Sequence, residues 1–129
     1  MPLTVEELVA AARSRIREVS VADLVDMLGG DLVLVDVREP GEYAQGHLPG
    51  AVNLPRGVLE FQIHAHPAMA CVPDGALAQS DRRLVLYCRT GGRSALAAGS
   101  LQQLGFTDVH SLAGGFQAWR NAGLTVSME

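Results

Sequence analysis

The sequence predicts an α/β fold with a mainly parallel central sheet flanked by helices. Two short, continuous apolar runs, Leu32 to Val35 and Leu84 to Tyr87, are typical of strands covered on both faces. Ala51 to Leu54 is a weaker strand candidate, and Val109 to Leu112 is another brief one. Segments with helical periodicity separate these runs, and strands that alternate with helices indicate a mainly parallel sheet.

An amphipathic helix is predicted over residues 4–17, before the first strand. Thr4 and Glu7 have the spacing of a capping box, and apolar residues recur on one face of the segment. Such a helix either completes the fold or mediates a homodimer, and both alternatives predict the same apolar face.

Three further helices follow from capping and stop signals. One begins after Ser20, a second follows Cys88 and stops at Gly105, and the last spans about Phe116 to Asn121. Between Phe61 and Arg83 the pattern is that of a helix end followed by a long loop. The 129-residue length suits one domain.

The charge composition excludes several classes of function. The net charge is -4, which argues against a nucleic-acid or anionic-membrane partner held by a basic surface. All ten cations are arginines, so a Schiff-base lysine, a pyridoxal phosphate anchor and a P-loop lysine are excluded. Glu6 and Glu7 stand where a signal peptide carries cations, and no apolar run reaches membrane-spanning length. We therefore expect a cytoplasmic protein.

Cys88 is placed for reaction by its surroundings. It follows a buried strand and precedes a helix, at the sheet edge where α/β proteins bind ligands. Gly91 and Gly92 allow the backbone N–H groups to turn inward as an anion-binding nest, and the helix dipole adds positive potential. These donors, with Arg89 and Arg93 nearby, favour the thiolate over the thiol.

Three separate motifs then resemble the rhodanese family, in the order and context that the family shows. The first block comprises residues 36–40 (DVREP), followed by 46–51 (GHLPGA). The second is the loop 87–94 (YCRTGGRS), and the third is 112–116 (LAGGF). The resemblance implies the rhodanese-like three-layer fold over residues 19–125, with an N-terminal helical extension at 1–18 and a tail at 126–129.

The resemblance also implies sulfur transfer through a Cys88 persulfide, with thiosulfate as a donor and cyanide or a thiol as acceptor. No metal or organic cofactor is then needed. The partner is a small sulfur-containing anion or thiol. We expect five loop residues to bind it: Arg89, Thr90, Gly91, Gly92 and Arg93.

Two alternatives remain. Related phosphatases and arsenate reductases carry five residues between the cysteine and the arginine, whereas four intervene between Cys88 and Arg93. A shorter loop suits a persulfide better than a tetrahedral phosphate. A non-catalytic binding module of the same fold typically lacks the cysteine, which this chain retains.

Other polar and aromatic residues are interpreted as structural. Asp36 and Arg38 suit buried hydrogen bonding to loops, and His47 lies in a glycine-proline turn. Phe116 and Trp119 are expected to anchor the core.

A metal site is not expected from His64, His66 and Cys71. These three candidates lie in an irregular segment without a second cysteine or histidine pair, which falls short of a closed zinc site. Cys71 could instead resolve an oxidised Cys88, although nothing in the sequence fixes their separation.

Overall fold

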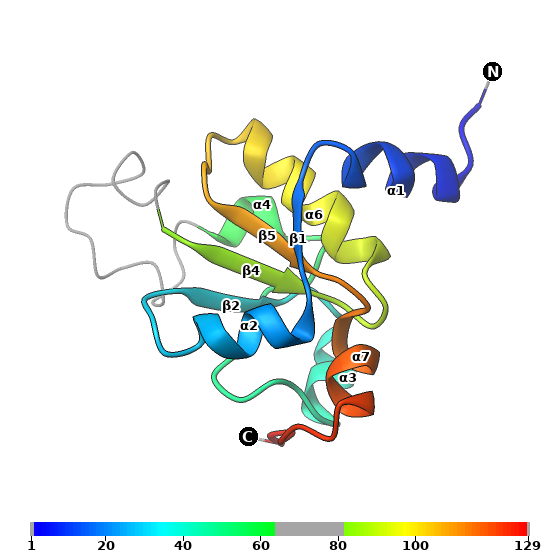
Figure 1. Ribbon diagram of the computed structural model, residues 1–129. Coiled ribbons are helices and arrows are strands. Elements are labelled where there is room, and N and C mark those ends of the chain that lie inside the picture. Colours follow the sequence, from blue (N-terminus) through cyan, green and yellow to red (C-terminus); the bar gives the residue numbers. More distant parts are fainter. Residues whose placement is uncertain (1, 64–81, 129) are drawn as a thin grey trace.

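A five-stranded, all-parallel sheet forms the centre of the computed structural model, which describes residues 2–63 and 82–128 (Figure 1). The strand order is β1-β5-β4-β2-β3. The strands are β1 (Arg17–Val19), β2 (Val33–Asp36), β3 (Val52–Asn53), β4 (Leu84–Tyr87) and β5 (Val109–Leu112). The α/β class predicted from alternating strands and helices is confirmed.

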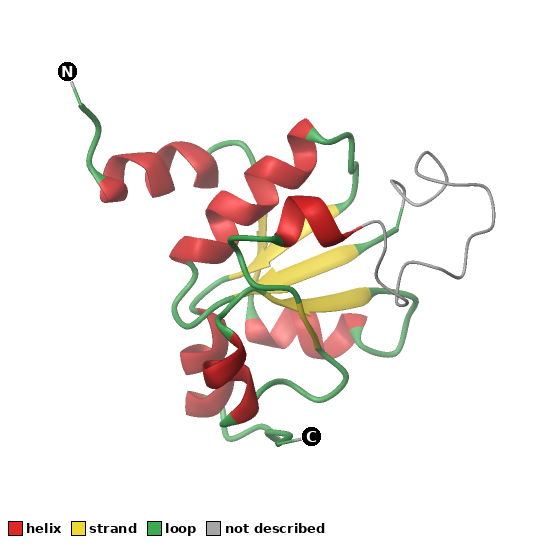
Figure 2. Cartoon of the chain, turned by 180° about the vertical axis from the view of Figure 1, so that it is seen from behind, coloured by secondary structure: helices red, strands yellow, loops and turns green. Residues whose placement is uncertain are grey.

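Helices cover both faces of the sheet and give three layers (Figures 1 and 2). The helices are α1 (Val5–Arg13), α2 (Val21–Met27), α3 (Pro40–Ala44), α4 (Leu59–Gln62), α6 (Gly92–Gln103) and α7 (Gly115–Asn121). Helices α4 and α6 cover one face, and α2 and α7 lie on the other. Each helix in the described ranges is too short or too polar to span a membrane.

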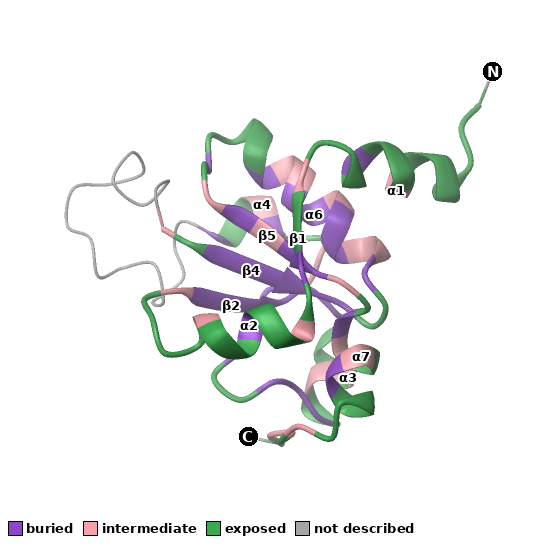
Figure 3. Ribbon diagram, viewed as in Figure 1, coloured by how far each residue is buried: buried purple, intermediate pink, exposed green. Residues whose placement is uncertain are grey.

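The two apolar clusters of the core follow the alternation of side chains along the central strands. Leu84 and Leu86 of β4 pack with α4 and α6, whereas Val85 and Tyr87 pack with α2 and α7. All residues of β2 and β4 are buried, as Figure 3 shows. Burial on both faces explains why these strands appear in the sequence as unbroken apolar runs.

The N-terminal segment differs from the predicted single helix over residues 4–17. Helix α1 has the predicted capping box but ends at Arg13, and the chain continues into edge strand β1. Ala12 is buried where α1 packs against α6. The helix therefore packs onto the rest of its own chain.

The polarity of the sheet brings two loops together. In the sheet, β2 and β4 are neighbours. The chain that leaves β2 returns as β3 on one side of this pair, and the chain that leaves β4 returns as β5 on the other side, so the strand order reverses between β2 and β4. Ligands bind at such a switch point in open α/β sheets. Cys88 follows β4 there, and Val37 and Arg38 follow β2.

Candidate active site

The Cys88 side chain lies at the bottom of a tight loop between β4 and α6. The residue is only 1% exposed. Its Sγ accepts backbone N–H groups from Gly91 and Ser94, at N···S distances of 3.0 and 3.4 Å. Gly91 precedes α6 with φ of 114°, in the left-handed region that favours glycine, and this turn aims its N–H at the sulfur. Backbone N–H groups of the loop therefore turn inward toward the sulfur, and their binding of a substrate anion stays a prediction.

The balance of burial and hydrogen bonding favours the thiolate. Burial by itself raises the pKa of the Cys88 thiol. The hydrogen bonds from Ser94, Gly91 and Thr90 outweigh that effect, so the pKa of Cys88 lies below its usual value. Backbone N–H groups at the entrance of α6 supply most of these bonds, as expected for an anion at a helix N-terminus.

Ser94 adds a side-chain donor that the sequence analysis did not single out. Its Oγ lies 3.6 Å from the Cys88 Sγ and 2.8 Å from the Oγ of Ser111 on β5. Both serines are fully buried. As a thiol, Cys88 donates to the Ser94 Oγ, and the Ser94 hydroxyl donates to the Gly91 carbonyl at 3.3 Å. A thiolate has no hydrogen to donate, so the Ser94 hydroxyl then turns its hydrogen to the sulfur and can accept from Ser111.

Of the two loop arginines predicted to hold the substrate anion, one is bound by a carboxylate and the other lines a neighbouring pocket. Arg93 forms a forked ion pair with Glu42 of α3, with N···O distances of 2.8 and 3.1 Å. This bond lowers the pKa of Glu42 to about 2. Arg89 is exposed and lines a neighbouring pocket. No guanidinium is among the donors to Sγ in the described residues, so the role of Arg89 and Arg93 in anion binding stays a prediction.

Helix α7 forms backbone hydrogen bonds to the first two residues of the loop. The backbone N–H of Phe116 donates to the carbonyl of Cys88 at 2.8 Å, and the N–H of Gln117 donates to that of Arg89 at 3.0 Å. Gly115 permits this contact, because a Cβ there would lie 2.5 Å from the Cys88 carbonyl oxygen. The glycine motif near the C-terminus thus positions the start of the loop.

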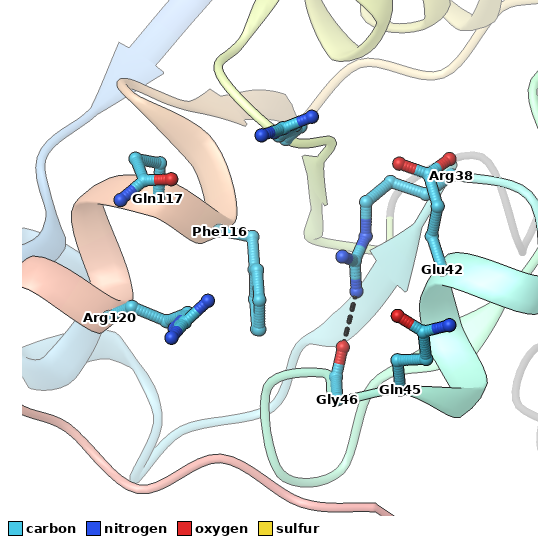
Figure 4. A pocket seen from close by; sticks show the side chains of 8 residues that line it. Arg38, Glu42, Gln45, Gly46, Phe116, Gln117 and Arg120 are labelled. Carbon is cyan, nitrogen blue, oxygen red and sulfur yellow. Dashed lines mark hydrogen bonds between the residues drawn. The ribbon is translucent and has the colours of Figure 1, made fainter.

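A pocket of about 290 Å³ lies beside the loop and is lined by residues from several elements (Figure 4). Its lining comprises Arg38, Glu42, Gln45, Gly46, Arg89, Phe116, Gln117 and Arg120. Only Arg89 was predicted as a site residue. The others come from the loop after β2, from α3 and the turn that follows it, and from α7, all of which are distant from Cys88 in the sequence.

Asp36 and Arg38 form the buried hydrogen-bonding pair that the sequence suggested. The guanidinium of Arg38 contacts the carboxylate of Asp36 at 2.8 Å and donates to the carbonyl of Gly46 at 2.6 Å. Burial lowers the pKa of Arg38, but the bonds to Asp36 outweigh it and raise the pKa overall. The Arg38 guanidinium therefore stays charged, and it holds the loop after β2 against the turn at Gly46.

Two of the remaining residues interpreted as structural, His47 and Trp119, are buried as expected, whereas Phe116 is not. His47 is buried, lies with Nδ1 2.9 Å from the carbonyl oxygen of Tyr43 and stacks on that ring. Trp119 is buried and donates to the carbonyl of Thr125. Phe116, expected in the core, is only half-buried, and its ring lines the pocket 4.3 Å from the Arg38 Cζ.

The segment that was weighed for metal binding or redox chemistry lies outside the described residues. This applies to His64, His66 and Cys71. Among the residues that the structure describes, no cluster of three histidine, cysteine, aspartate or glutamate side chains could hold a metal ion.

Known proteins resemble this chain over most of its length. A family model described as a rhodanese-like domain matches residues 20–122. A sulfurtransferase of Allochromatium vinosum is 38% identical over 96 residues, which cover 74% of this chain and 78% of that protein. The thiosulfate sulfurtransferase GlpE of Shewanella oneidensis is 37% identical over 110 residues, or 84% of this chain and 97% of that protein.

A similar fold also occurs in a solved structure that is not described as a sulfurtransferase. RPA3614 of Rhodopseudomonas palustris, described as a protein of unknown function and possible tyrosine phosphatase, has a TM-score of 0.79 at 34% identity. The match covers 98% of this chain and 99% of that chain. The similar proteins thus include named sulfurtransferases and a structure of unknown function described as a possible tyrosine phosphatase.

Proposed function

Because this chain belongs to the rhodanese-like sulfurtransferase family, we propose that it moves a sulfane sulfur from a donor such as thiosulfate to a thiophilic acceptor through a Cys88 persulfide. The observation that carries this proposal is the Cys88 sulfur, which accepts N–H groups from Gly91 and Ser94 inside the loop. A buried sulfur with these donors is stabilised as the thiolate, which is the nucleophilic form.

In the first half-reaction, the Cys88 thiolate attacks the outer sulfur of thiosulfate. The sulfur–sulfur bond of thiosulfate breaks, its electron pair leaves with sulfite, and the outer sulfur remains on Cys88. The persulfide carries its negative charge on the added sulfur. The loop N–H groups and the positive end of α6 stabilise a charge at this position, so they favour the intermediate.

In the second half-reaction, a nucleophile such as cyanide or a thiolate attacks the outer sulfur of the persulfide. The bond between that sulfur and the Cys88 Sγ breaks, and its electron pair restores the Cys88 thiolate. Ser94 and Gly91 then stabilise the leaving thiolate as they did in the resting enzyme. No metal or organic cofactor takes part in either step.

Phosphate ester hydrolysis is the alternative that the RPA3614 resemblance keeps open. A phosphatase loop surrounds three equatorial oxygens with donors, and an arginine at its end supports them. Here the loop has four residues between Cys88 and Arg93, and the Arg93 guanidinium is bound by Glu42. Both features favour sulfur transfer over phosphate binding.

Steady-state turnover of two substrates distinguishes these functions. We expect the protein to convert thiosulfate and cyanide to thiocyanate and sulfite, and to hydrolyse aryl phosphates negligibly at the same pH. Cys88→Ser should abolish turnover of thiosulfate. Cys71→Ser, a change outside the described residues, serves as the control and should retain most of the activity. Efficient Cys88-dependent release of phosphate by the unmodified protein would replace this proposal by the phosphatase alternative.

A further inference from the structure

The arginines of this chain divide into a paired and an unpaired group. Seven of the ten lie in ion pairs with carboxylates. In the described parts of the chain, no carboxylate pairs with the other three, which are Arg15, Arg89 and Arg120. Two of these three, Arg89 and Arg120, line the pocket beside the Cys88 loop. Uncompensated positive charge is therefore concentrated there.

The other charged groups of the pocket are already neutralised by partners. Arg38 is paired with the buried carboxylate of Asp36, and Glu42 is paired with Arg93. Gln45 and Gln117 contribute neutral amides. The net charge that the pocket offers to a ligand thus comes from Arg89 and Arg120, which favours an anionic group.

Residues that line the pocket form hydrogen bonds to both ends of the loop that contains Cys88. At the start of the loop, the N–H of Gln117 donates to the carbonyl of Arg89 at 3.0 Å. At its end, Glu42 binds Arg93 at 2.8 Å. A ligand held in the pocket therefore lies next to the loop that contains Cys88.

The size and walls of the pocket suit a ligand larger than an inorganic sulfur anion. Its volume of about 290 Å³ is near the lower end for small-molecule sites, which is about 300 Å³. The ring of Phe116 stands between the side chains of Arg38 and Arg120 in Figure 4 and provides an apolar wall. Cyanide and thiosulfate have no carbon chain to contact such a wall.

We propose that this pocket binds the carboxylate of an organic thiol that accepts the sulfur from Cys88, an inference that rests on the proposed sulfur transfer. The thiol loses its proton to solvent, and its sulfur attacks the outer sulfur of the Cys88 persulfide. The bond from that sulfur to Sγ breaks, its electron pair returns to Cys88, and the acceptor leaves as an organic persulfide. Arg120 and Arg89 bind the carboxylate, and Phe116 contacts the carbon chain.

The test compares two acceptors that differ only in the carboxylate. Mercaptopropionate and mercaptopropanol have the same chain length, and thiosulfate is the sulfur donor for both. The measured quantity is the ratio of kcat/KM for the acid to kcat/KM for the alcohol. Comparing this ratio between variants cancels the intrinsic reactivity of the two thiols. Arg120→Gln removes a pocket cation, and Arg15→Gln removes an unpaired arginine that does not line the pocket.

We expect Arg120→Gln to lower the ratio about tenfold through a higher KM for the acid, because one charge-assisted contact is lost. Arg15→Gln should leave the ratio at the wild-type value. An equal ratio in wild type and Arg120→Gln, with persulfide still formed from thiosulfate, would overturn the pocket assignment alone. If no sulfur is taken up from thiosulfate, the proposed function itself is wrong, and the acceptor site fails with it.

Discussion

Removal of the Ser94 hydroxyl is the change that most clearly separates the reactivity of Cys88 from the stability of the fold. In Ser94→Ala the backbone N–H still reaches the Cys88 Sγ, but the hydroxyl 3.6 Å from the sulfur is lost. The same change removes the hydrogen bond of 2.8 Å to the buried Ser111. We therefore expect two separate effects, one on the pKa of Cys88 and one on the free energy of unfolding.

The stability effect follows from the burial of Ser111. Its side chain is fully buried, and among the described residues its side-chain hydrogen bond is to the Ser94 Oγ. A buried hydroxyl left without a partner costs about 1–2 kcal/mol. For a domain of this size that loss lowers Tm by about 3–8 °C. Ser94→Ala/Ser111→Ala should recover most of this loss, because both polar partners are then absent.

The reactivity effect should not be recovered in the double variant. Without the Ser94 hydroxyl the pKa of Cys88 rises toward its usual value, so alkylation by iodoacetamide needs a higher pH in both variants. Ser111→Ala is the matched control, since it leaves the Ser94 hydroxyl able to donate to the sulfur. The rate of alkylation against pH is the assay. Identical profiles for wild type and Ser94→Ala would refute a contribution of this hydroxyl to the thiolate.

Two further predictions concern the supports of the loop. Gly115 has a φ of 59°, and in Gly115→Ala the Cβ would lie 2.5 Å from the Cys88 carbonyl oxygen. We therefore expect urea unfolding to show a free energy of unfolding about 2–4 kcal/mol lower than that of the wild type. The matched control is Gly123→Ala, because Gly123 has a φ of 76° but no atom near the added Cβ, and it should lower the free energy of unfolding by only about 1 kcal/mol. Equal losses in the two variants would contradict a close contact between residue 115 and the Cys88 carbonyl.

The second prediction is that the Glu42 pair loses its stabilisation as the pH falls from 4.5 to about 2, because pairing with Arg93 depresses the folded-state pKa. The pair is partly exposed, so this contribution is about 0.5–1 kcal/mol. In Glu42→Gln the free energy of unfolding should no longer fall by this amount between pH 4.5 and about 2. Acid-unfolding curves that are the same for Glu42→Gln and the wild type would argue against a stabilising Glu42–Arg93 pair.

The fold was predictable where burial determines the pattern of side chains. Strands Leu84–Tyr87 and Val109–Leu112 have the predicted bounds, since strands covered on both faces appear as apolar runs. Strand Arg17–Val19 was missed because only Val19 is buried at this edge position. Helix Pro40–Ala44 was missed because none of its residues is buried, so it has no apolar period. Its start did carry a signal, a proline at the first helical position.

The candidate site was predictable only where it is local in the sequence. Gly91, placed between a strand and a helix, predicted the nest around the Cys88 sulfur. The Ser94 donor was within reach of the same reasoning, since it lies in the first turn of the following helix. The pairing of Arg93 with Glu42 and the position of Arg120 depend on how α3 and α7 pack, which no local pattern encodes.

The most direct test of sulfur transfer is the mass of the intact protein before and after thiosulfate, followed by addition of cyanide. The account predicts that thiosulfate adds one sulfur atom, that peptide mapping locates it on Cys88, and that cyanide removes it as thiocyanate. Cys88→Ser should show no added mass under the same conditions. An unchanged mass of the wild-type protein, or an added sulfur that persists in Cys88→Ser, would contradict the central claim.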